Sequence, residues 1–384
     1  MTLQAAERAG VFARVSTSRW RQNRLLILCY HGVALADEHE WSDAHIPESR
    51  LRQRFEILRS KPCTVLPFRE ALERLTQGDL PPCSVTVTFD DGLYDFYERA
   101  LPLIQEYEIP TTLYASTYYS THRRPIFDPA CSYLLWRGRG VLIEPGNLLP
   151  RPMRIRVPER ASSRTALHLA IRAHMNAAGY SAVEKDAMLT HLAGQVGVDW
   201  NAFVGSRMLQ LMSPSEFASL DRRLIDVQLH THRHRTPRDE SLFMQELDDN
   251  IAALEAMGLP RSGLTQFCYP SGDADPIFYP WLEARGIQSA TTCEPRIATR
   301  RAHRLDLPRV IDTMAMSDAE FRGWTSGVCA LLPRRRFRTD QHELDAFADP
   351  DSALWRRIAR NGEMTASADP AAGARRAQPA LHRR

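Results

Sequence analysis

The sequence lacks long apolar runs. None of its 384 residues lies in a stretch that approaches the roughly eighteen apolar residues a membrane-spanning helix needs. Residues 1–24 also lack the run of about seven or more apolar residues after a basic start that is typical of a secretory signal. We therefore expect a cytoplasmic protein without a transmembrane segment.

Lysine is almost absent. Lys61 and Lys185 are its two occurrences, so nearly all of the 49 basic residues are arginine. The 46 acidic residues balance them to a net charge of +3, which is too small to indicate a nucleic-acid partner. We interpret the arginine excess as a bias in nucleotide composition and not as a binding surface.

The cysteines form no Cys-x-x-Cys pair. They are odd in number and widely spaced, and several lie in apolar runs, where free cysteine behaves as a small buried hydrophobe. This pattern indicates a reducing compartment. The seven are Cys29, Cys63, Cys83, Cys131, Cys268, Cys293 and Cys329.

The chemistry that is present centres on residues 85–95, V-T-V-T-F-D-D-G-L-Y-D. Valine and phenylalanine alternate with threonine, which predicts a strand with a mostly buried apolar face. Asp90, Asp91 and Gly92 follow, so we expect a turn that presents two carboxylates at the strand's end. Adjacent side chains there point in different directions, so one can bind a metal while the other faces a substrate. Taken alone, the motif is more often an acidic turn after a core strand, because such turns are common.

A histidine cluster follows a second apolar stretch. Residues 229–234 read L-H-T-H-R-H, directly after residues 224–228. His230 and His234 are four apart, which brings them to one side if the backbone coils after the strand. Two imidazoles and one carboxylate make a three-ligand site with open positions, as catalytic zinc sites have. Without the aspartate pair, such a cluster is more often solvated.

Four ordered motifs resemble one family. They are L-C-Y-H-G-V at 28–33, T-F-D-D-G at 88–92, H-T-x-x-H at 230–234 and F-C-Y-P-S-G at 267–272. Together they resemble the polysaccharide deacetylases of the NodB-homology type, carbohydrate esterase family four, over roughly residues 24–330 with one long interruption. The resemblance implies a metal-dependent hydrolase that removes N-acetyl or O-acetyl groups from a sugar or glycan, with a place in exopolysaccharide biosynthesis.

The resemblance also implies a metal site. Asp91, His230 and His234 would hold a divalent ion. Zn²⁺ is our first choice, and Co²⁺ or Ni²⁺ suits the same ligands. Asp90, held off the metal, would act as general base. His31, at the end of an apolar N-terminal strand, would act as general acid.

The late motif departs from the family pattern. Cys268 stands where the family has an arginine that orients the catalytic aspartate, and Arg309 is our candidate to replace it. In the stretch Tyr269, Pro270 and Ser271, which we assign to oxyanion and substrate contacts, Ser271 replaces a tyrosine whose backbone N–H is the oxyanion donor. Ser271 can still supply that N–H.

Alternating strand and helix patterns predict a parallel α/β architecture, and a barrel if the sheet closes. With the resemblance, we expect a distorted (β/α) barrel of the NodB type over residues 25–333, interrupted by a helical insertion at about 123–205. Residues 1–24 would be an N-terminal extension, and residues 334–384 a basic, disordered tail with a short helix around 354–355.

Three alternatives stay open. Two histidines and a carboxylate also define non-haem iron oxygenases, although the aspartate pair here comes from a different strand. The missing arginine suggests a catalytically weak, glycan-binding relative. A third alternative is a hydrolase of another non-peptide C–N bond on the same barrel.

Overall fold

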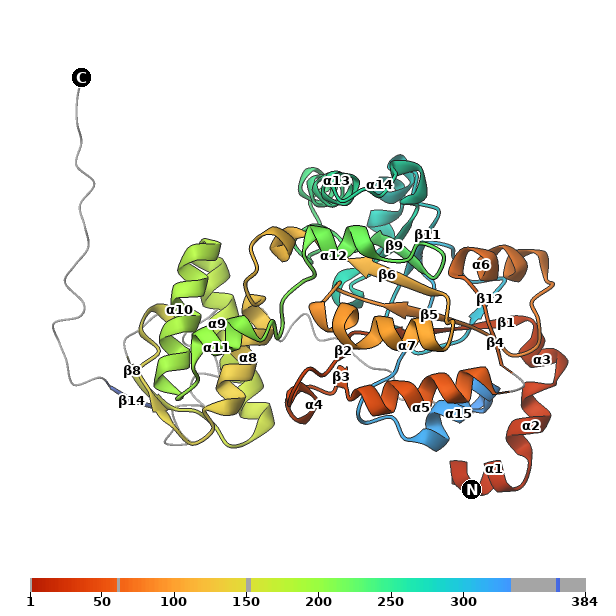
Figure 1. Ribbon diagram of the computed structural model, residues 1–384, viewed down its shortest axis with the longest axis horizontal. Coiled ribbons are helices and arrows are strands. Elements are labelled where there is room, and N and C mark those ends of the chain that lie inside the picture. Colours follow the sequence, from red (N-terminus) through yellow and green to blue (C-terminus); the bar gives the residue numbers. More distant parts are fainter. Residues whose placement is uncertain (1, 61–62, 150–152, 333–363, 367–384) are drawn as a thin grey trace. The chain divides into compact units, whose positions relative to one another are not determined.

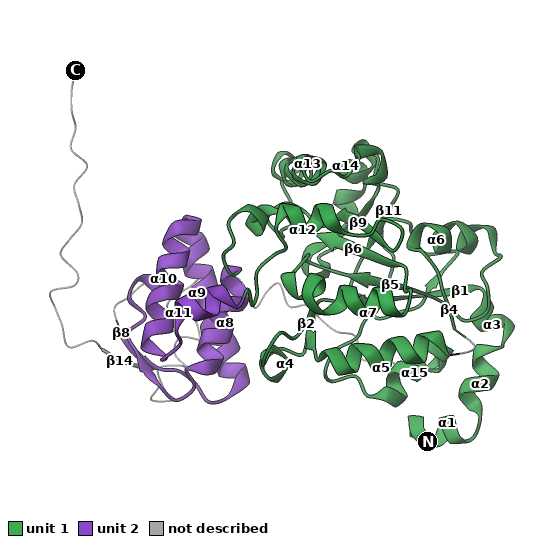
Figure 2. Cartoon of the chain, in the orientation of Figure 1, with its two compact units in different colours: residues 1–125, 207–335 green, residues 126–206, 336–384 purple. Residues whose placement is uncertain are grey.

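The computed structural model describes residues 2–60, 63–149, 153–332 and 364–366. The chain divides into two compact units (Figure 2). Unit 1 combines Met1–Pro125 with Arg207–Arg335, and unit 2 combines Ile126–Ser206 with Arg336–Arg384. The predicted insertion at about 123–205 therefore falls almost entirely within unit 2.

Unit 1 is built on a nine-stranded sheet in the order β11-β10-β9-β6-β5-β1-β12, with β4 paired to β5 and β13 paired to β1 (Figure 1). The described strand pairs of this sheet are parallel, apart from β12, which runs antiparallel to β1. The sheet confirms the predicted parallel α/β architecture. The strands are β1 Arg24–Tyr30, β4 Thr64–Val65, β5 Ser84–Phe89, β6 Thr111–Ala115, β9 Ile225–Leu229, β10 Gln266–Cys268, β11 Ser289–Thr291, β12 Ala298–Thr299 and β13 Val310–Ile311. A separate parallel pair joins β2 Gly32–Val33 to β3 His45–Ile46.

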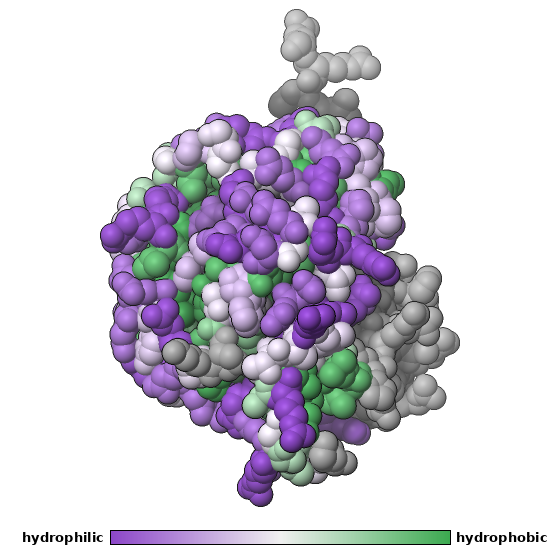
Figure 3. Space-filling view, turned by 90° about the vertical axis from the view of Figure 1, so that its right-hand side faces the viewer, coloured by the Kyte–Doolittle hydropathy of each residue, from purple (hydrophilic) through white to green (hydrophobic). Residues whose placement is uncertain are grey.

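The central strands are buried on both faces, because helices cover a parallel sheet from both sides. Every residue of β5 is buried, including Thr86 and Thr88, which the alternating pattern assigns to a second, less apolar face. Thr88 satisfies its hydroxyl by donating to the carbonyl of Leu28, at 2.8 Å. Polar side chains cover most of the face seen in Figure 3, and apolar residues there form small, separate patches.

Residues 96–106 of unit 1 are helical but do not form a single α-helix. Phe96–Ala100 is a π-helix, and Leu101–Glu106 continues it as an α-helix. Pro102 has no N–H to donate to the carbonyl four residues earlier, which accounts for the widened turn. Ser213 and Glu216 form a capping box at the start of a short helix that ends at Ser219. The helices are α1 Leu3–Arg8, α2 Val11–Ser16, α3 Arg19–Gln22, α4 Glu38–Trp41, α5 Glu48–Arg59, α6 Phe68–Gln77, α7 Leu101–Glu106, α12 Pro214–Ser219, α13 Glu240–Ala256, α14 Tyr279–Ala284 and α15 Asp318–Ser326.

Unit 2 contains helices and a small antiparallel sheet in the order β14-β8-β7, which the sequence did not predict. Its elements are α8 Phe127–Arg137, β7 Leu142–Ile143, β8 Met153–Arg156, α9 Ala161–Ala177, α10 Ala182–Gln195, α11 Trp200–Gly205 and β14 Met364–Ala366. β14 is the described part of the predicted tail. The helix expected around 354–355 lies outside the described residues. Across those residues, none of the helices is long and apolar enough to span a membrane.

A buried ion pair secures α5 to the loop after β13. The Arg54 guanidinium, fully buried, donates to Asp312 at 2.8 Å, to Asp318 at 2.7 Å and to the Met316 carbonyl at 2.9 Å. Asp312 is equally buried, and burial raises the pKa of its carboxyl while Arg54 opposes that rise.

We expect Arg54→Leu to lower the free energy of unfolding by about 3–5 kcal/mol, because Asp312 keeps its burial and loses its cation. Urea unfolding at neutral pH measures the change. Arg52→Ala is the matched control on the same helix, since the ion pairs of Arg52 with Glu48 and Glu106 are exposed, and it should leave the midpoint nearly unchanged. Equal destabilisation by both variants would contradict this account of the buried pair.

Candidate functional site

The predicted site residues meet at one edge of the sheet. His31 follows β1, Asp90 and Asp91 follow β5, and His230 follows β9. Parallel strands bring their carboxyl ends to the same edge, which is where ligands bind in α/β sheets. Sequence position alone therefore accounts for their gathering.

Asp91, His230 and His234 converge on a common point. The Oδ1 atom of Asp91 lies 3.3 Å from Nε2 of His230 and 3.2 Å from Nε2 of His234. Asp91 and His234 both have left-handed backbone conformations, with φ of 70° and 53°. Such conformations are uncommon for residues other than glycine and gather at functional sites.

The three side chains fit a divalent cation. Nδ1 of His230 lies 2.8 Å from the carbonyl oxygen of Cys268, which can only accept, so Nδ1 carries the proton and Nε2 offers its lone pair toward Asp91. Oδ1 of Asp91 is buried and has no hydrogen-bond partner among the described residues. Ligands bound tetrahedrally at about 2.0–2.1 Å lie roughly 3.3 Å from one another, which is the spacing found here. The arrangement is a set of candidate metal ligands.

Asp90 is held away from that point by Arg309. The guanidinium makes a two-pronged contact, with Nη1 2.7 Å from Oδ1 and Nη2 2.6 Å from Oδ2 of Asp90, and both side chains are buried. Burial acts to raise the pKa of Asp90, but the charge and hydrogen bonds of Arg309 hold it below its ordinary value. Asp90 is therefore ionised, and its two oxygens are fixed in place.

Thiols and His31 complete the surroundings of Asp90. The Sγ atoms of Cys29 and Cys268 each lie 3.4 Å from Oδ2 of Asp90, and Nη2 of Arg309 lies 2.9 Å from Sγ of Cys268. The cysteine that stands in the family's arginine position thus contacts the arginine that we expected to replace it. Nε2 of His31 lies 3.9 Å from Oδ2 of Asp90, and the His31 side chain is 24% exposed, so it is accessible to a ligand.

The late motif is only partly as predicted. Tyr269 is a core residue and not a substrate contact: its hydroxyl donates to the Leu305 carbonyl at 3.0 Å, and its N–H donates to the Thr291 carbonyl at 3.1 Å. Its ring packs against Phe267 of β10 and against Phe278, which directly precedes α14, and this packing explains the burial. Pro270 is buried and has no N–H to offer. Ser271 is exposed, with a φ of 58°, and its assignment as oxyanion donor stays a prediction.

Helix α13 supplies partners that sequence reasoning missed. Oδ1 of Asn250 accepts from the N–H of His230 at 3.0 Å, and its amide donates to the Ala115 carbonyl at 3.0 Å. Glu246 accepts from the Arg233 N–H at 2.7 Å. Both side chains are fully buried. Their polar character on the inward, otherwise apolar face of α13 is the signal that would have found them.

A second buried pair lies behind His31. A Cβ on Gly32 would approach the His45 ring to 2.2 Å, so only glycine fits after His31. Burial lowers the pKa of His45 to about 4, and its Nε2 lies 3.8 Å from Oδ2 of the buried Asp95. A neutral imidazole therefore packs beneath this end of β1.

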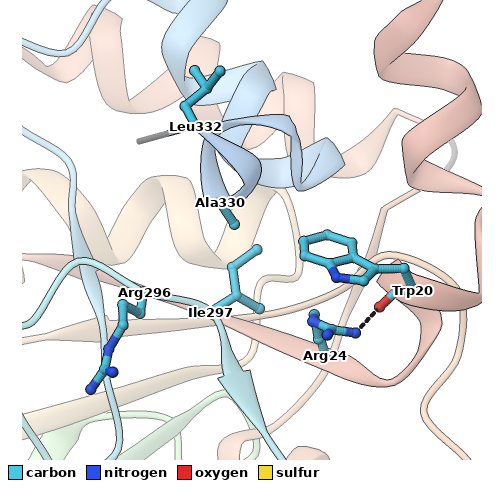
Figure 4. Close-up of a pocket in the computed structure, with 6 residues that line it drawn as sticks. All are labelled: Trp20, Arg24, Arg296, Ile297, Ala330 and Leu332. Carbon is cyan, nitrogen blue, oxygen red and sulfur yellow. Dashed lines mark hydrogen bonds between the residues drawn. The ribbon is translucent and has the colours of Figure 1, made fainter. Parts of the chain in front are cut away.

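A pocket of about 310 Å³ lies at the opposite end of β1 (Figure 4). Arg24, the first residue of β1, packs its guanidinium over the Trp20 ring and donates to the Trp20 carbonyl. The pocket is thus separate from the carboxyl ends of the strands. It is lined by Trp20, Arg24, Arg296, Ile297, Ala330 and Leu332.

Comparison with curated proteins finds N-deacetylases. The chain is 28% identical over 105 residues to poly-β-1,6-N-acetyl-D-glucosamine N-deacetylase of Staphylococcus aureus, a match that covers 24% of this chain and 36% of that protein. The protein of the same name from Escherichia coli is 32% identical over 96 residues, which cover 24% of this chain and 14% of that protein. The matches thus span well under half of these relatives. No family model matches the chain.

Comparison with solved structures finds the same kind of fold. The Streptococcus pyogenes deacetylase PplD, determined in complex with acetate, aligns over 81% of this chain and 99% of its own, with a TM-score of 0.51 and 14% identity. This likeness confirms the distorted (β/α) barrel with surrounding helices. In fold, and in sequence over about a quarter of its length, the chain resembles the polysaccharide deacetylases, as its four motifs predicted.

Proposed function

We propose that this protein is a metal-dependent hydrolase that removes N-acetyl groups from a carbohydrate. The observation that carries the proposal is the pairing of two aspartates with separate partners at one edge of the sheet. Asp91 faces two imidazole nitrogens, and Asp90 faces Arg309. The local similarity to N-deacetylases supports the same chemistry.

Asp91, His230 and His234 would hold the metal. Their mixed nitrogen and oxygen donors suit Zn²⁺, and Co²⁺ or Ni²⁺ equally. Bound there, such an ion would polarise the acetyl carbonyl and lower the pKa of a coordinated water.

The chain's own groups would then move the protons. Asp90, ionised and held by Arg309, accepts a proton from the attacking water as general base. The N–H of Ser271 donates to the carbonyl oxygen as negative charge develops on it. His31 gives a proton to the nitrogen as its bond to the acetyl carbon breaks, so the products are acetate and a free amine.

The comparisons support a substrate class. Relatives named for poly-β-1,6-N-acetyl-D-glucosamine support an N-acetylated hexosamine in a glycan or in its precursor. A cytoplasmic location, which stays a prediction, would favour a lipid-linked sugar or an imported oligosaccharide over an external polymer. The contact between Arg309 and Asp90 counts against the inactive, glycan-binding alternative, because it fills the role that the missing arginine left open.

The test is acetate release from free, nucleotide-linked and oligomeric N-acetylated sugars by zinc-loaded protein. We expect release that a chelator abolishes and added Zn²⁺ restores. Stoichiometric zinc with no acetate from any sugar would contradict deacetylation and point to a binding protein or to another scissile bond. Bound iron with oxygen consumption would instead favour the oxygenase alternative.

Mutation of a residue that only hydrogen-bonds to a metal ligand costs roughly 10–100-fold in metal affinity or activity. We expect His234→Gln, which removes a candidate ligand itself, to reduce metal affinity and acetate release by more than this. His232→Gln is the matched control from the same loop, because Nδ1 of His232 lies 2.8 Å from the Thr117 hydroxyl and His232 is not among the candidate ligands. Metal content by mass spectrometry and acetate release together distinguish the two. Equal metal loss in both variants would refute the ligand assignment.

A further inference from the structure

Two cysteines meet at the amino ends of neighbouring strands, far along β5 from the candidate metal ligands. Thr64 of β4 pairs with Ser84 of β5 in parallel register, so Cys63 and Cys83 precede the paired residues by one position on each strand. The Thr64 N–H donates to the Cys83 carbonyl at 3.3 Å, which extends the ladder to this point. Opposed residues of parallel strands point to the same side, and strands lie about 4.7–4.9 Å apart. That spacing falls within the Cα separation of about 4.4–6.8 Å that disulfides require.

The two thiols already interact. Both cysteines are free, and each thiol shifts the pKa of the other, lowering it at Cys83 and raising it at Cys63. Sγ of Cys83 also donates to the Thr325 carbonyl at 3.0 Å. Cys83 is buried and has a left-handed φ of 56°, whereas Cys63 is half-buried, so a small reagent can reach the pair from the side of Cys63.

A buried arginine stands beside the pair. The Arg21 guanidinium donates to the Thr325 carbonyl at 3.1 Å and to the Ser84 carbonyl at 3.0 Å, which anchors it between β5 and α15. Cys63 and the charge of the Arg21 guanidinium together lower the pKa of Cys83 to about 7 against the effect of burial. Thiolates are the reacting form of cysteine.

We propose that Cys63 and Cys83 are a thiol-modification site that closes into a disulfide when the protein meets a low-molecular-mass disulfide such as oxidised glutathione. The Cys83 thiolate attacks one sulfur of glutathione disulfide, forms a mixed disulfide and releases one glutathione thiolate, which takes up a proton. Cys63 loses its proton and attacks the Cys83 sulfur, which releases the second glutathione. Two electrons pass from the cysteine pair to the glutathione disulfide, and both sides balance.

The bond would secure an edge of the sheet. β4 is a two-residue strand that pairs with β5 alone in the described sheet, and β5 carries Asp90 and Asp91 at its other end. Closing the loop of residues 63–83, which includes α6, reduces the freedom of the unfolded chain and stabilises the folded one. We expect oxidation to raise the Tm by on the order of 5 °C.

The experiment oxidises the full chain in glutathione redox buffers and maps crosslinks by mass spectrometry of a non-reduced digest. We expect a peptide pair joined through Cys63 and Cys83, loss of two of the seven reactive thiols counted after denaturation, and a higher Tm that reductant reverses. Seven thiols remaining, or crosslinks that join other cysteines, would overturn the proposal.

Two variants sharpen the test. Cys63→Ser, at a half-buried position, should stop at a glutathione adduct on Cys83 and lose the rise in Tm. Cys131→Ser, at a lone buried cysteine of α8, should still form the disulfide and keep the rise. A rise in Tm that persists in Cys63→Ser would also overturn the proposal, and the wild-type redox titration decides the question without any variant.

Discussion

Asp90→Asn is expected to keep the metal and to lose about 10²–10⁴-fold in kcat/KM for acetate release. Loss of a positioned general base costs this much, because asparagine cannot accept the proton from water. Asp90 makes its closest contacts with Arg309 and not with the two histidines, so metal binding should be nearly unaffected. Metal content and steady-state kinetics on one preparation measure both effects.

Asp91→Asn is the matched control from the adjacent position. It should lose the metal and, with it, activity that excess Zn²⁺ restores only in part. Because asparagine at position 90 leaves the buried Arg309 without a full counter-charge, the melting temperature of each variant is recorded beside its kinetics. Metal lost in Asp90→Asn and kept in Asp91→Asn would reverse the assignment of the two aspartates.

Arg309→Met is expected to abolish acetate release and to lower the free energy of unfolding by about 3–5 kcal/mol at neutral pH. Asp90 is 3% exposed in its side chain, so removal of the guanidinium leaves a buried carboxylate without a cation. Methionine fills similar space, so a cavity contributes little. Urea unfolding measures the loss, and Arg296→Met, at an exposed arginine, should leave stability nearly unchanged.

The free energy of unfolding that Arg309→Met loses should depend on pH, and the pKa of Asp90 determines in which direction. In the wild type, Arg309 holds that pKa below the unfolded value of about 3.9, so this contribution to stability is present above pH 4 and lost as pH falls. Without Arg309, burial raises the pKa of Asp90, so stability is lost as pH rises. The difference between the two proteins should therefore be small in acid and widest at neutral pH.

The double variant Arg309→Met with Asp90→Asn isolates the unpaired charge. It should recover much of the stability lost in Arg309→Met, because no buried ion remains, while acetate release stays absent. Additive destabilisation in the double variant would show that Arg309 acts through packing and not through its pairing with Asp90.

The candidate metal-ligand residues could be predicted from the sequence because each part of the group is local. The apolar alternation of residues 85–89 predicted β5, and the residues that break it, Asp90 to Gly92, had to lie at its carboxyl end. His230 and His234 follow a strand in the same way. Parallel strands then bring these ends together without any further information. The capping box at Ser213 is local in the same sense, since its partners lie three residues apart.

Other features required the three-dimensional structure. Arg309 and Asp90 lie 219 residues apart, and the sequence offered Arg309 only as a candidate among many arginines. The hydrogen bond between Asn250 and the His230 N–H and the burial of Tyr269 likewise depend on which segments pack against each other. Cys63 and Cys83 looked like two unrelated small hydrophobes until the register of β4 on β5 placed them side by side.

The division has a physical cause. Backbone preferences and the two-residue and 3.6-residue periodicities act over a few neighbouring residues. Nearby residues therefore determine each helix or strand, its ends and the reactive groups at those ends. Which buried charge meets which partner depends on packing between distant segments, where side chains with the same composition have many possible neighbours. The local pattern of this chain therefore determined the candidate metal ligands, and the tertiary fold decided that Arg309 pairs with Asp90 beside them.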